Sequence, residues 1–349
     1  MFLAKAATIV IAIVLVIGVI VAAGSKQNKT GKRGALKVSR LNEHFDEMRD
    51  TLRENLLDKE HLKLINKEEK KKTKTEQKEQ KAKLKETTQK EDLSEELRKR
   101  CVFVLSFKGN VAADAVASLR EEITAILSMA GNDDEIILRL ESPGGLVHAY
   151  GLASSQLLRI KKKKIPLTIC VDKVAASGGY MMACLADKLV AAPFAIIGSI
   201  GVLVQLPNFH RVLKKYDVDY EQISAGEYKR TLSLFGEVTS KGREKIQEDV
   251  ENIHDIFKLW VKEHRPSIEI DKISTGETWV GTQAKERYMV DEIRTSDECI
   301  LEACSNADVF EIEYEFKKTI QDKITRVLEE SNSRLISRWF EKPTNDIYQ

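Results

Sequence analysis

The sequence predicts an α/β domain in which helices cross between largely parallel strands, preceded by a single membrane-spanning helix. From residue 101 onward, short runs rich in Val, Ile and Leu alternate with longer amphipathic stretches, and turns containing glycine separate several of them. Nearer the N-terminus, residues 7–24 form one uncharged apolar run. The first pattern is typical of strand–helix–strand units, and the second is typical of a helix that crosses a bilayer.

The apolar run follows a short tail, residues 1–6, and as a helix it would span roughly 27 Å. A cleaved signal peptide would have a shorter apolar core and a small-x-small exit, of which residues 22–24 are a weak version. A buried core helix would rarely be apolar on every face. We therefore expect residues 7–24 to be an uncleaved anchor in contact with lipid.

The region between the anchor and the α/β pattern is rich in charge. Residues 25–66 combine a basic stretch with one apolar stripe at helical spacing, made of Leu41, Phe45, Met48, Leu52 and Leu56. Residues 67–100 have low complexity, and ten lysines and six glutamates fall within residues 67–91. Such a composition buries too little apolar area to fold alone, so we expect a solvated spacer.

Charge and cysteine content exclude several function classes. Residues 26–100 carry 23 Lys and Arg against 16 Asp and Glu, whereas residues 101–349 carry 32 against 38. A mildly acidic domain lacks the basic footprint of a nucleic-acid enzyme. The five cysteines include no CxxC pair, so neither a disulfide framework nor a zinc site is expected, and no other metal or cofactor either. Cys170 and Cys184 lie in apolar runs and are expected in the core.

We assign residues 101–312 to the catalytic domain and residues 313–349 to an amphipathic C-terminal helix and tail. Within the domain, strands are expected at residues 102–107, 135–140, 167–171, 188–192 and 201–205. Helices are expected to end near residues 127 and 160. Residues 181–206 are apolar enough to mimic a second membrane span, but Asp187, Lys188 and Pro193 interrupt them, so we place them in the core.

Two turns carry residues suited to acyl transfer. Gly144 and Gly145 follow a predicted strand, where paired glycines expose amide N–H groups that can bind an oxyanion, although many turns contain this pair. Ser177 opens a helix, where the dipole and free N–H groups favour developing negative charge. An N-cap serine is the commoner alternative. The two glycines that follow Ser177 favour the nucleophile, since they make a poor helix start.

Lys229 is the candidate general base. Most lysines are solvated surface residues, and a lysine base must lose its proton through burial, which the sequence alone does not show. A lysine base would explain a serine nucleophile without an obvious histidine partner. Among the histidines, only His148, three residues after Gly145, is placed to compete for this role.

Five motifs occur in order along the chain: ESPGG at residues 141–145, VAASGGY at 174–180, GSIGV at 198–202, GEYKR at 226–230 and GETWVGTQAKE at 276–286. This set resembles the signal peptide peptidase A family of membrane serine peptidases, and the resemblance covers essentially the whole chain. One departure is Tyr288, where the family usually has a glycine. It lies outside the motifs that would carry the chemistry.

The resemblance implies a Clp-protease/crotonase-like fold and a Ser-Lys dyad. Ser177 would match the nucleophile, Lys229 the general base, and Ser199 the hydroxyl that orients the lysine amine. The amides of Gly144 and Gly178 would match the oxyanion hole. Members of this family assemble into rings or domes, so a homo-oligomer is expected. The dyad then pairs either within one chain or between neighbouring subunits.

The resemblance also implies an inner-membrane endopeptidase that acts on peptides, signal-peptide remnants or misfolded proteins. Five cations follow the anchor at residues 26–37, so the positive-inside rule would place the domain in the cytoplasm. The family favours the periplasmic side, which we adopt. Two alternatives from other classes are a crotonase-type acyl-CoA enzyme and a non-catalytic membrane scaffold. The serine, the lysine and the anchor together favour the peptidase.

Overall fold

The computed structural model describes residues 34–64, 67, 71, 100–131 and 133–316. The anchor expected at residues 7–24, nearly all of the spacer and most of the C-terminal helix and tail expected at residues 313–349 lie outside these residues. Residues 313–315, which were expected in that helix, are instead the end of a strand. In the part that is described, no helix has both the length and the apolar character needed to cross a membrane. Residues 37–313 form one compact unit. In the other unit, the Gly34 amide donates to the Tyr314 hydroxyl at 2.8 Å.

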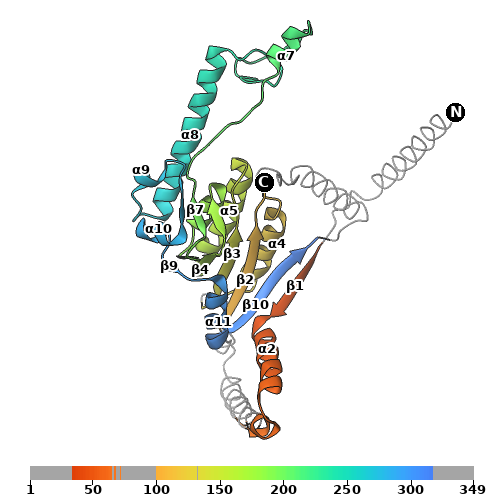
Figure 1. Cartoon of the computed structure of the whole chain (residues 1–349), viewed down its shortest axis with the longest axis vertical. Coiled ribbons are helices and arrows are strands. Elements are labelled where there is room, and N and C mark those ends of the chain that lie inside the picture. Colours follow the sequence, from red (N-terminus) through yellow and green to blue (C-terminus); the bar gives the residue numbers. More distant parts are fainter. Residues whose placement is uncertain (1–33, 65–66, 68–70, 72–99, 132, 317–349) are drawn as a thin grey trace, which may run out of the picture. The chain divides into compact units, whose positions relative to one another are not determined.

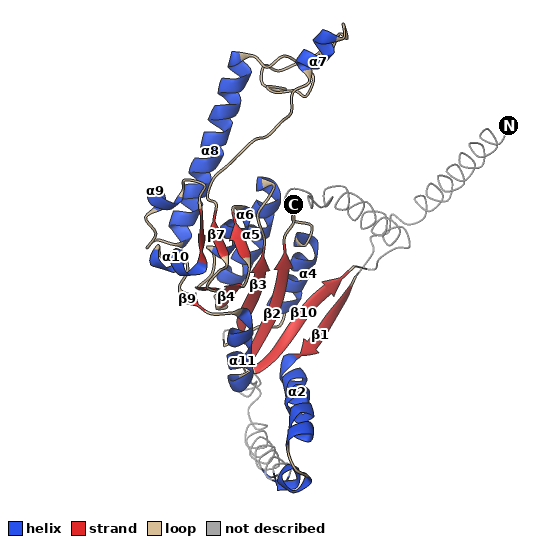
Figure 2. Ribbon diagram, viewed as in Figure 1, coloured by secondary structure: helices blue, strands red, loops and turns tan. Residues whose placement is uncertain are grey.

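A seven-stranded sheet forms the centre of the large unit (Figures 1 and 2), with the strand order β1-β10-β2-β3-β4-β6-β9. Its strands are β1 (Ala35–Arg40), β2 (Cys101–Lys108), β3 (Glu135–Glu141), β4 (Leu167–Val171), β6 (Lys188–Ala191), β9 (Glu292–Ile293) and β10 (Asp308–Glu315). The pairs from β10 across to β9 are all parallel. The expected α/β class with a largely parallel sheet is therefore confirmed.

Both faces of this sheet are covered, which explains why its central strands are almost continuously apolar. Successive side chains of β2 alternate between two separate apolar clusters, so that Phe103 and Leu105 enter one and Val102 and Val104 the other. The larger cluster lies under the helices α4 (Val116–Leu127), α5 (Val147–Lys162) and α6 (Gly178–Ala183). Cys170 and Cys184 are buried, as expected.

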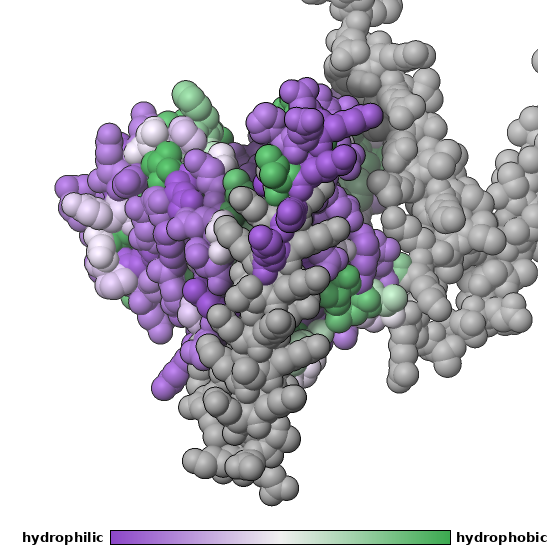
Figure 3. Space-filling view, turned by 90° about the horizontal axis from the view of Figure 1, so that it is seen from below, coloured by the Kyte–Doolittle hydropathy of each residue, from purple (hydrophilic) through white to green (hydrophobic). Residues whose placement is uncertain are grey.

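The smaller cluster is covered by α2 (Leu41–Leu56) and α11 (Ser296–Asn306). The predicted stripe of α2 packs only at its start, through Leu41 and Phe45, whereas Leu52 and Leu56 are exposed. The end of the molecule where α2 and α11 lie is shown in Figure 3, and its described surface is mostly hydrophilic with small separate hydrophobic patches.

A second sheet of three strands carries the turns of interest. It contains β5 (Val174–Ala176), β7 (Ile196–Gly198) and β8 (Thr278–Val280), with β5 and β7 parallel and β8 antiparallel to β7. The strand expected at residues 201–205 is wrong, because the chain forms β7 earlier and residues 201–209 have no regular structure. Leu203 is 73% exposed, so the apolar pattern of this stretch does not reflect burial in a sheet.

The remaining helices are α7 (His210–Lys215), α8 (Ser240–His264), α9 (Ile270–Ile273) and α10 (Gly281–Glu286). Near its C-terminal end α8 packs on the domain, where Phe257 and Val261 are buried and the Trp260 indole donates to the Met181 carbonyl at 3.0 Å. Its N-terminal half projects from the domain together with α7, as Figure 1 shows. We call residues 202–253 the arm.

An ion pair fastens the C-terminal end of α8 to the sheet. The Arg265 guanidinium donates to both carboxylate oxygens of Asp291 at 2.9 and 2.6 Å, and the Leu189 amide donates to Asp291 at 2.7 Å. Burial alone would raise the pKa of Asp291, but these hydrogen bonds outweigh it and the pKa is lowered. A lowered carboxyl pKa means that the ionised form stabilises the folded state.

We therefore expect Asp291→Asn to lower the free energy of unfolding at pH 7 by about 1 kcal/mol, a value reduced for the partial exposure of the carboxylate. The difference from wild type should shrink as the pH falls from about 4 through the lowered pKa of the folded state, because the carboxylate is protonated first in the unfolded chain and then in the folded protein. Urea denaturation at several pH values measures this. Glu286→Gln, at an exposed carboxylate with no ion pair among the described residues, is the control. A difference that stays constant at every pH would contradict the assignment.

Candidate active site

Ser177 lies between the end of β5 and the start of α6 in an unusual backbone conformation. Its φ is 51° and its ψ is −119°, a region that residues with a Cβ rarely adopt. Such a residue costs of order 1–3 kcal/mol and persists only where the surroundings hold it. A strained serine between a strand and a helix is also the geometry of the nucleophile elbow in hydrolases.

Two backbone hydrogen bonds hold this turn. The Ser177 amide donates to the Gly198 carbonyl at 2.8 Å, and the Ser177 carbonyl accepts from the Met181 amide at 3.0 Å. The Ser177 side chain makes no capping hydrogen bond to the helix. The N-cap alternative for this hydroxyl is therefore not observed, and the half-buried side chain makes no hydrogen bond to another described residue.

Ser199 follows the strand next to Ser177. The parallel register pairs Ala176 with Gly198, so the two serines occupy equivalent positions just beyond the paired strand ends. Ser199 also has a positive φ, 52°, and its amide donates to the Glu277 carbonyl at 2.6 Å. The structure thus brings Ser177 and Ser199 to the same edge of the small sheet.

The glycine turn lies directly against the Ser177 turn. A Cβ added to Gly144 would come within 2.7 Å of the Ala176 carbonyl oxygen and within 2.8 Å of both the Gly178 nitrogen and the Ser177 Cβ. Gly144 also has a φ of +89°, which favours glycine. Gly178 is the first residue of α6, and the first amides of a helix have no partner within it.

The Gly144 amide is already engaged in this structure. It donates to the Ser142 hydroxyl oxygen at 3.1 Å, whereas the Gly145 amide has no hydrogen-bond partner among the described residues. The structure therefore places Gly144 and Gly178 together beside Ser177. In this turn, however, the amide that remains open to a ligand belongs to Gly145.

Lys229 lies on the arm in an exposed turn, where its amide donates to the Gly226 carbonyl at 3.1 Å. The neighbouring side chains fasten this turn to the first turns of α8. Glu227 forms an ion pair with Lys241, and that hydrogen bond lowers the pKa of Glu227. The ring of Tyr228 lies 5.8 Å from the Lys241 ammonium.

The same helix shows how far this turn is from the serines. The His254 imidazole, further along α8, lies 3.3 Å from the carbonyl of Ile200, the residue after Ser199. From residue 241 to residue 254 the helix extends about 20 Å at 1.5 Å per residue. Within one chain, Lys229 is therefore not brought to Ser177.

The other candidates can be placed as well. His148 is exposed at the second residue of α5, and its imidazole makes no hydrogen bond to another described residue. No cluster of three or more metal-ligating side chains occurs in the described part of the chain.

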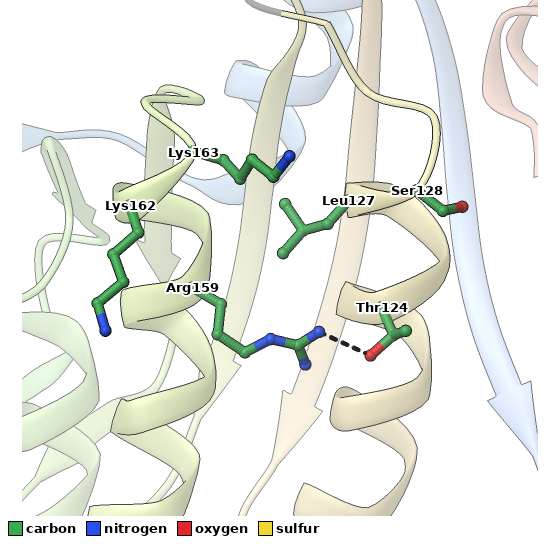
Figure 4. Close-up of a pocket in the computed structure, with 6 residues that line it drawn as sticks. All are labelled: Thr124, Leu127, Ser128, Arg159, Lys162 and Lys163. Carbon is green, nitrogen blue, oxygen red and sulfur yellow. Dashed lines mark hydrogen bonds between the residues drawn. The ribbon is translucent and has the colours of Figure 1, made fainter.

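Figure 4 shows a pocket of about 420 Å³ lined by Arg159, Lys162 and Lys163, in which the Arg159 guanidinium donates to the Thr124 hydroxyl at 2.9 Å. It lies at the opposite end of α5 from the glycine turn.

Comparison with known proteins gives the family. The model of the N-terminal part of peptidase family S49 matches residues 1–157, and the model of peptidase family S49 matches residues 159–310. The chain belongs to peptidase family S49. This confirms the resemblance drawn from the five motifs, and it makes the protein a peptidase whose substrates are peptides or proteins.

Several family S49 relatives are bacterial proteins named as proteases. A probable protease SohB of Haemophilus influenzae is 49% identical over 99% of this chain and 96% of its own length. A putative protease SohB of Buchnera aphidicola is 42% identical over 92% of this chain and 90% of its own length. A putative signal peptide peptidase SppA of Enterococcus faecium is 29% identical over 47% of this chain and 48% of its own length.

Sequence reasoning did not single out three residues that the structure brings to this S49 site. Ser142 lies within the quoted ESPGG motif but was passed over in favour of the glycines, and Tyr150 is an ordinary aromatic of an amphipathic helix. His254 lies on the long, highly charged helix α8. Nothing local in the sequence distinguishes the latter two, since their positions depend on packing between distant elements.

Gly144→Ala is expected to destabilise the protein by several kcal/mol and to abolish peptidase activity, because the new methyl group would meet backbone atoms at a strained φ. Gly151→Ala is the matched control. Gly151 lies within α5 and a Cβ there would meet nothing within 4 Å, so stability should rise by about 0.5–1 kcal/mol. Urea denaturation and cleavage of casein measure both effects. Full activity of Gly144→Ala would refute the close packing described above.

Proposed function

We propose that this S49 peptidase is a serine endopeptidase in which Ser177 is the nucleophile and Lys229 the general base. The observation that carries the proposal is the strained backbone of Ser177 between β5 and α6. Its hydroxyl makes no capping hydrogen bond to the helix. Ser199, at the neighbouring strand end, is suited to orient the lysine amine. We also infer a fold of the Clp-protease/crotonase type.

The chemistry follows from these roles. Neutral Lys229 accepts the proton of the Ser177 hydroxyl, whose oxygen attacks the peptide carbonyl. Backbone amides stabilise the tetrahedral oxyanion, each worth roughly 3 kcal/mol. We assign this role to Gly178 and, because the Gly144 amide is held by Ser142, to Gly145. Lys229 then protonates the leaving amine, and water hydrolyses the acyl-enzyme to release the second product and the free serine.

We further propose that the dyad is shared between subunits, with Lys229 on the arm of one chain and Ser177 in the domain of its neighbour. The length of α8 between the two regions of one chain supports this arrangement. The arm also exposes many apolar side chains, and its most exposed ones are Leu203, Tyr216 and Ile223. Surfaces of this kind mark protein–protein contacts.

Assembly would also meet the chemical requirement on the base. Lys229 is exposed in the single chain, whereas a lysine that acts as a base must be held in its neutral form. Contact with a neighbouring domain would bury the amine and favour its neutral form. A head-to-tail contact of this type repeats around a closed ring, so every subunit would give one lysine and receive another.

The setting of the enzyme is proposed from the sequence. Residues 7–24 would anchor it in the bacterial inner membrane with the catalytic domain on the periplasmic side, and residues 67–100 would form a charged spacer. The substrates would be peptides, signal-peptide remnants or misfolded proteins close to that membrane. Of residues 313–349, those that follow β10 would form an amphipathic helix and tail.

Ser177→Ala and Lys229→Ala should each abolish cleavage of casein by the purified full-length protein in detergent. If the dyad is shared, unfolding and refolding the two inactive proteins together should restore about a quarter of the wild-type activity. In a random mixture of equal amounts, this is the fraction of all contacts between neighbours that hold both an intact serine and an intact lysine. Activity is measured per mole of protein, after size-exclusion chromatography has shown that the oligomer is intact.

His148→Ala is the control for the base and should keep the wild-type rate. Activity that remains in Lys229→Ala but is lost in His148→Ala would show that the base is wrongly assigned. No recovery on mixing, with both single variants inactive and normally assembled, would place the dyad within one chain instead.

A further inference from the structure

A chain of buried hydroxyl groups lies behind the glycine turn. The Ser142 and Tyr150 side chains are both fully buried, and their oxygens are 2.6 Å apart. The Tyr150 hydroxyl donates to the Asn110 carbonyl at 2.8 Å, and the Gly144 amide donates to the Ser142 oxygen at 3.1 Å. Four groups from three segments of the chain are thus connected in series.

The direction of every hydrogen bond in this series is fixed. A carbonyl can only accept, so the single proton of the Tyr150 hydroxyl goes to Asn110. The Ser142 hydroxyl must therefore donate its proton to Tyr150. Its remaining lone pairs are free to accept the Gly144 N–H, so this amide points into the protein.

The same two residues touch the Ser177 turn. The Ser142 amide donates to the Val174 carbonyl at 2.8 Å, and the Ser142 carbonyl accepts from the Ala176 amide at 3.0 Å, which ties Ser142 to the strand that ends at the nucleophile. The Tyr150 ring packs so closely on Gly178 that a Cβ there would collide with the ring. Both walls of the proposed oxyanion site therefore rest on Ser142 and Tyr150.

We propose that Ser142 and Tyr150 are positioning residues for the oxyanion hole. By drawing the Gly144 amide inward, the hydroxyl chain leaves the Gly145 amide as the donor that the oxyanion receives from this turn. Neither side chain contacts the substrate. This inference rests on the proposed function of Ser177, and its effect should appear in the chemical step and not in substrate binding.

The hydroxyl chain should hold over the working pH range of the enzyme. Burial raises the pKa of Tyr150, and the hydrogen bond from Ser142 lowers it by a smaller amount. The phenol therefore stays neutral and keeps the proton that it gives to Asn110. Activity lost in a Tyr150 variant should accordingly be lost equally across neutral and mildly alkaline pH.

The test compares Tyr150→Phe, Ser142→Ala and the double variant. Tyr150→Phe keeps the ring against Gly178 and removes only the hydroxyl. We expect kcat for a peptide substrate to fall about ten- to a hundredfold in each single variant, with KM changed less than about twofold. Because the two hydroxyls act in series, the double variant should be no slower than Ser142→Ala.

Tyr180→Phe is the matched control. Tyr180 is equally buried, and its hydroxyl donates to the Met289 carbonyl at 3.0 Å, so this variant loses a comparable hydrogen bond outside the series. Its kcat should stay within about twofold of wild type. The folded fraction of each variant is measured by thermal unfolding and used to normalise the rates.

Two outcomes would overturn the inference. One is a normal kcat in both Tyr150→Phe and Ser142→Ala, and the other is a loss in Tyr180→Phe as large as in Tyr150→Phe. A double variant whose loss is the product of the single losses would show two independent effects and also contradict the series. Ser177→Ala is assayed in parallel, since residual activity there would refute the proposed nucleophile itself. If Ser177→Ala is inactive while Tyr150→Phe keeps the wild-type kcat, only the positioning role is refuted.

Discussion

The positive φ of Ser177 is the constraint on which the local architecture depends. A strained residue keeps its conformation only if its neighbours fix it from several sides. Here the β7 strand end accepts the Ser177 amide, and the glycine turn presses against its Cβ. A parallel bridge between Ser142, which follows β3, and Ala175 of β5 brings the ends of these two strands together. Helices α5 and α6 then begin there, one after each turn.

In the proposed enzyme, the domain supplies the nucleophile and the oxyanion amides, and the arm supplies the general base. The domain supplies the rigid part, where buried hydrogen bonds hold the nucleophile and the oxyanion amides without room for adjustment. The arm carries Lys229 at the end of a long helix with exposed apolar side chains. A dyad completed only by a neighbour would keep the isolated chain inactive.

The sequence predicted the features that local patterns determine. Apolar runs located the central strands, and the motif glycines identified the turns that meet at Ser177. The strand predicted at residues 201–205 was wrong, because an exposed apolar stretch of the arm has the same sequence pattern as a buried strand. The pairing of β1 with β10 and the contact of Tyr150 with Gly178 join segments far apart in the chain. Nor could the sequence show that the Gly144 amide points inward, since the direction of a peptide group depends on Ser142.

In the proposed enzyme, the fold prepares Ser177 as a nucleophile that Lys229 activates from a neighbouring chain. Covalent labelling tests it most directly: the assembled full-length protein is treated with a fluorophosphonate and the modified peptide is mapped by mass spectrometry. We expect modification of Ser177 in the wild type and none in Lys229→Ala of the same oligomeric size. Modification of another serine, or equal labelling of Ser177 in both proteins, would contradict the claim.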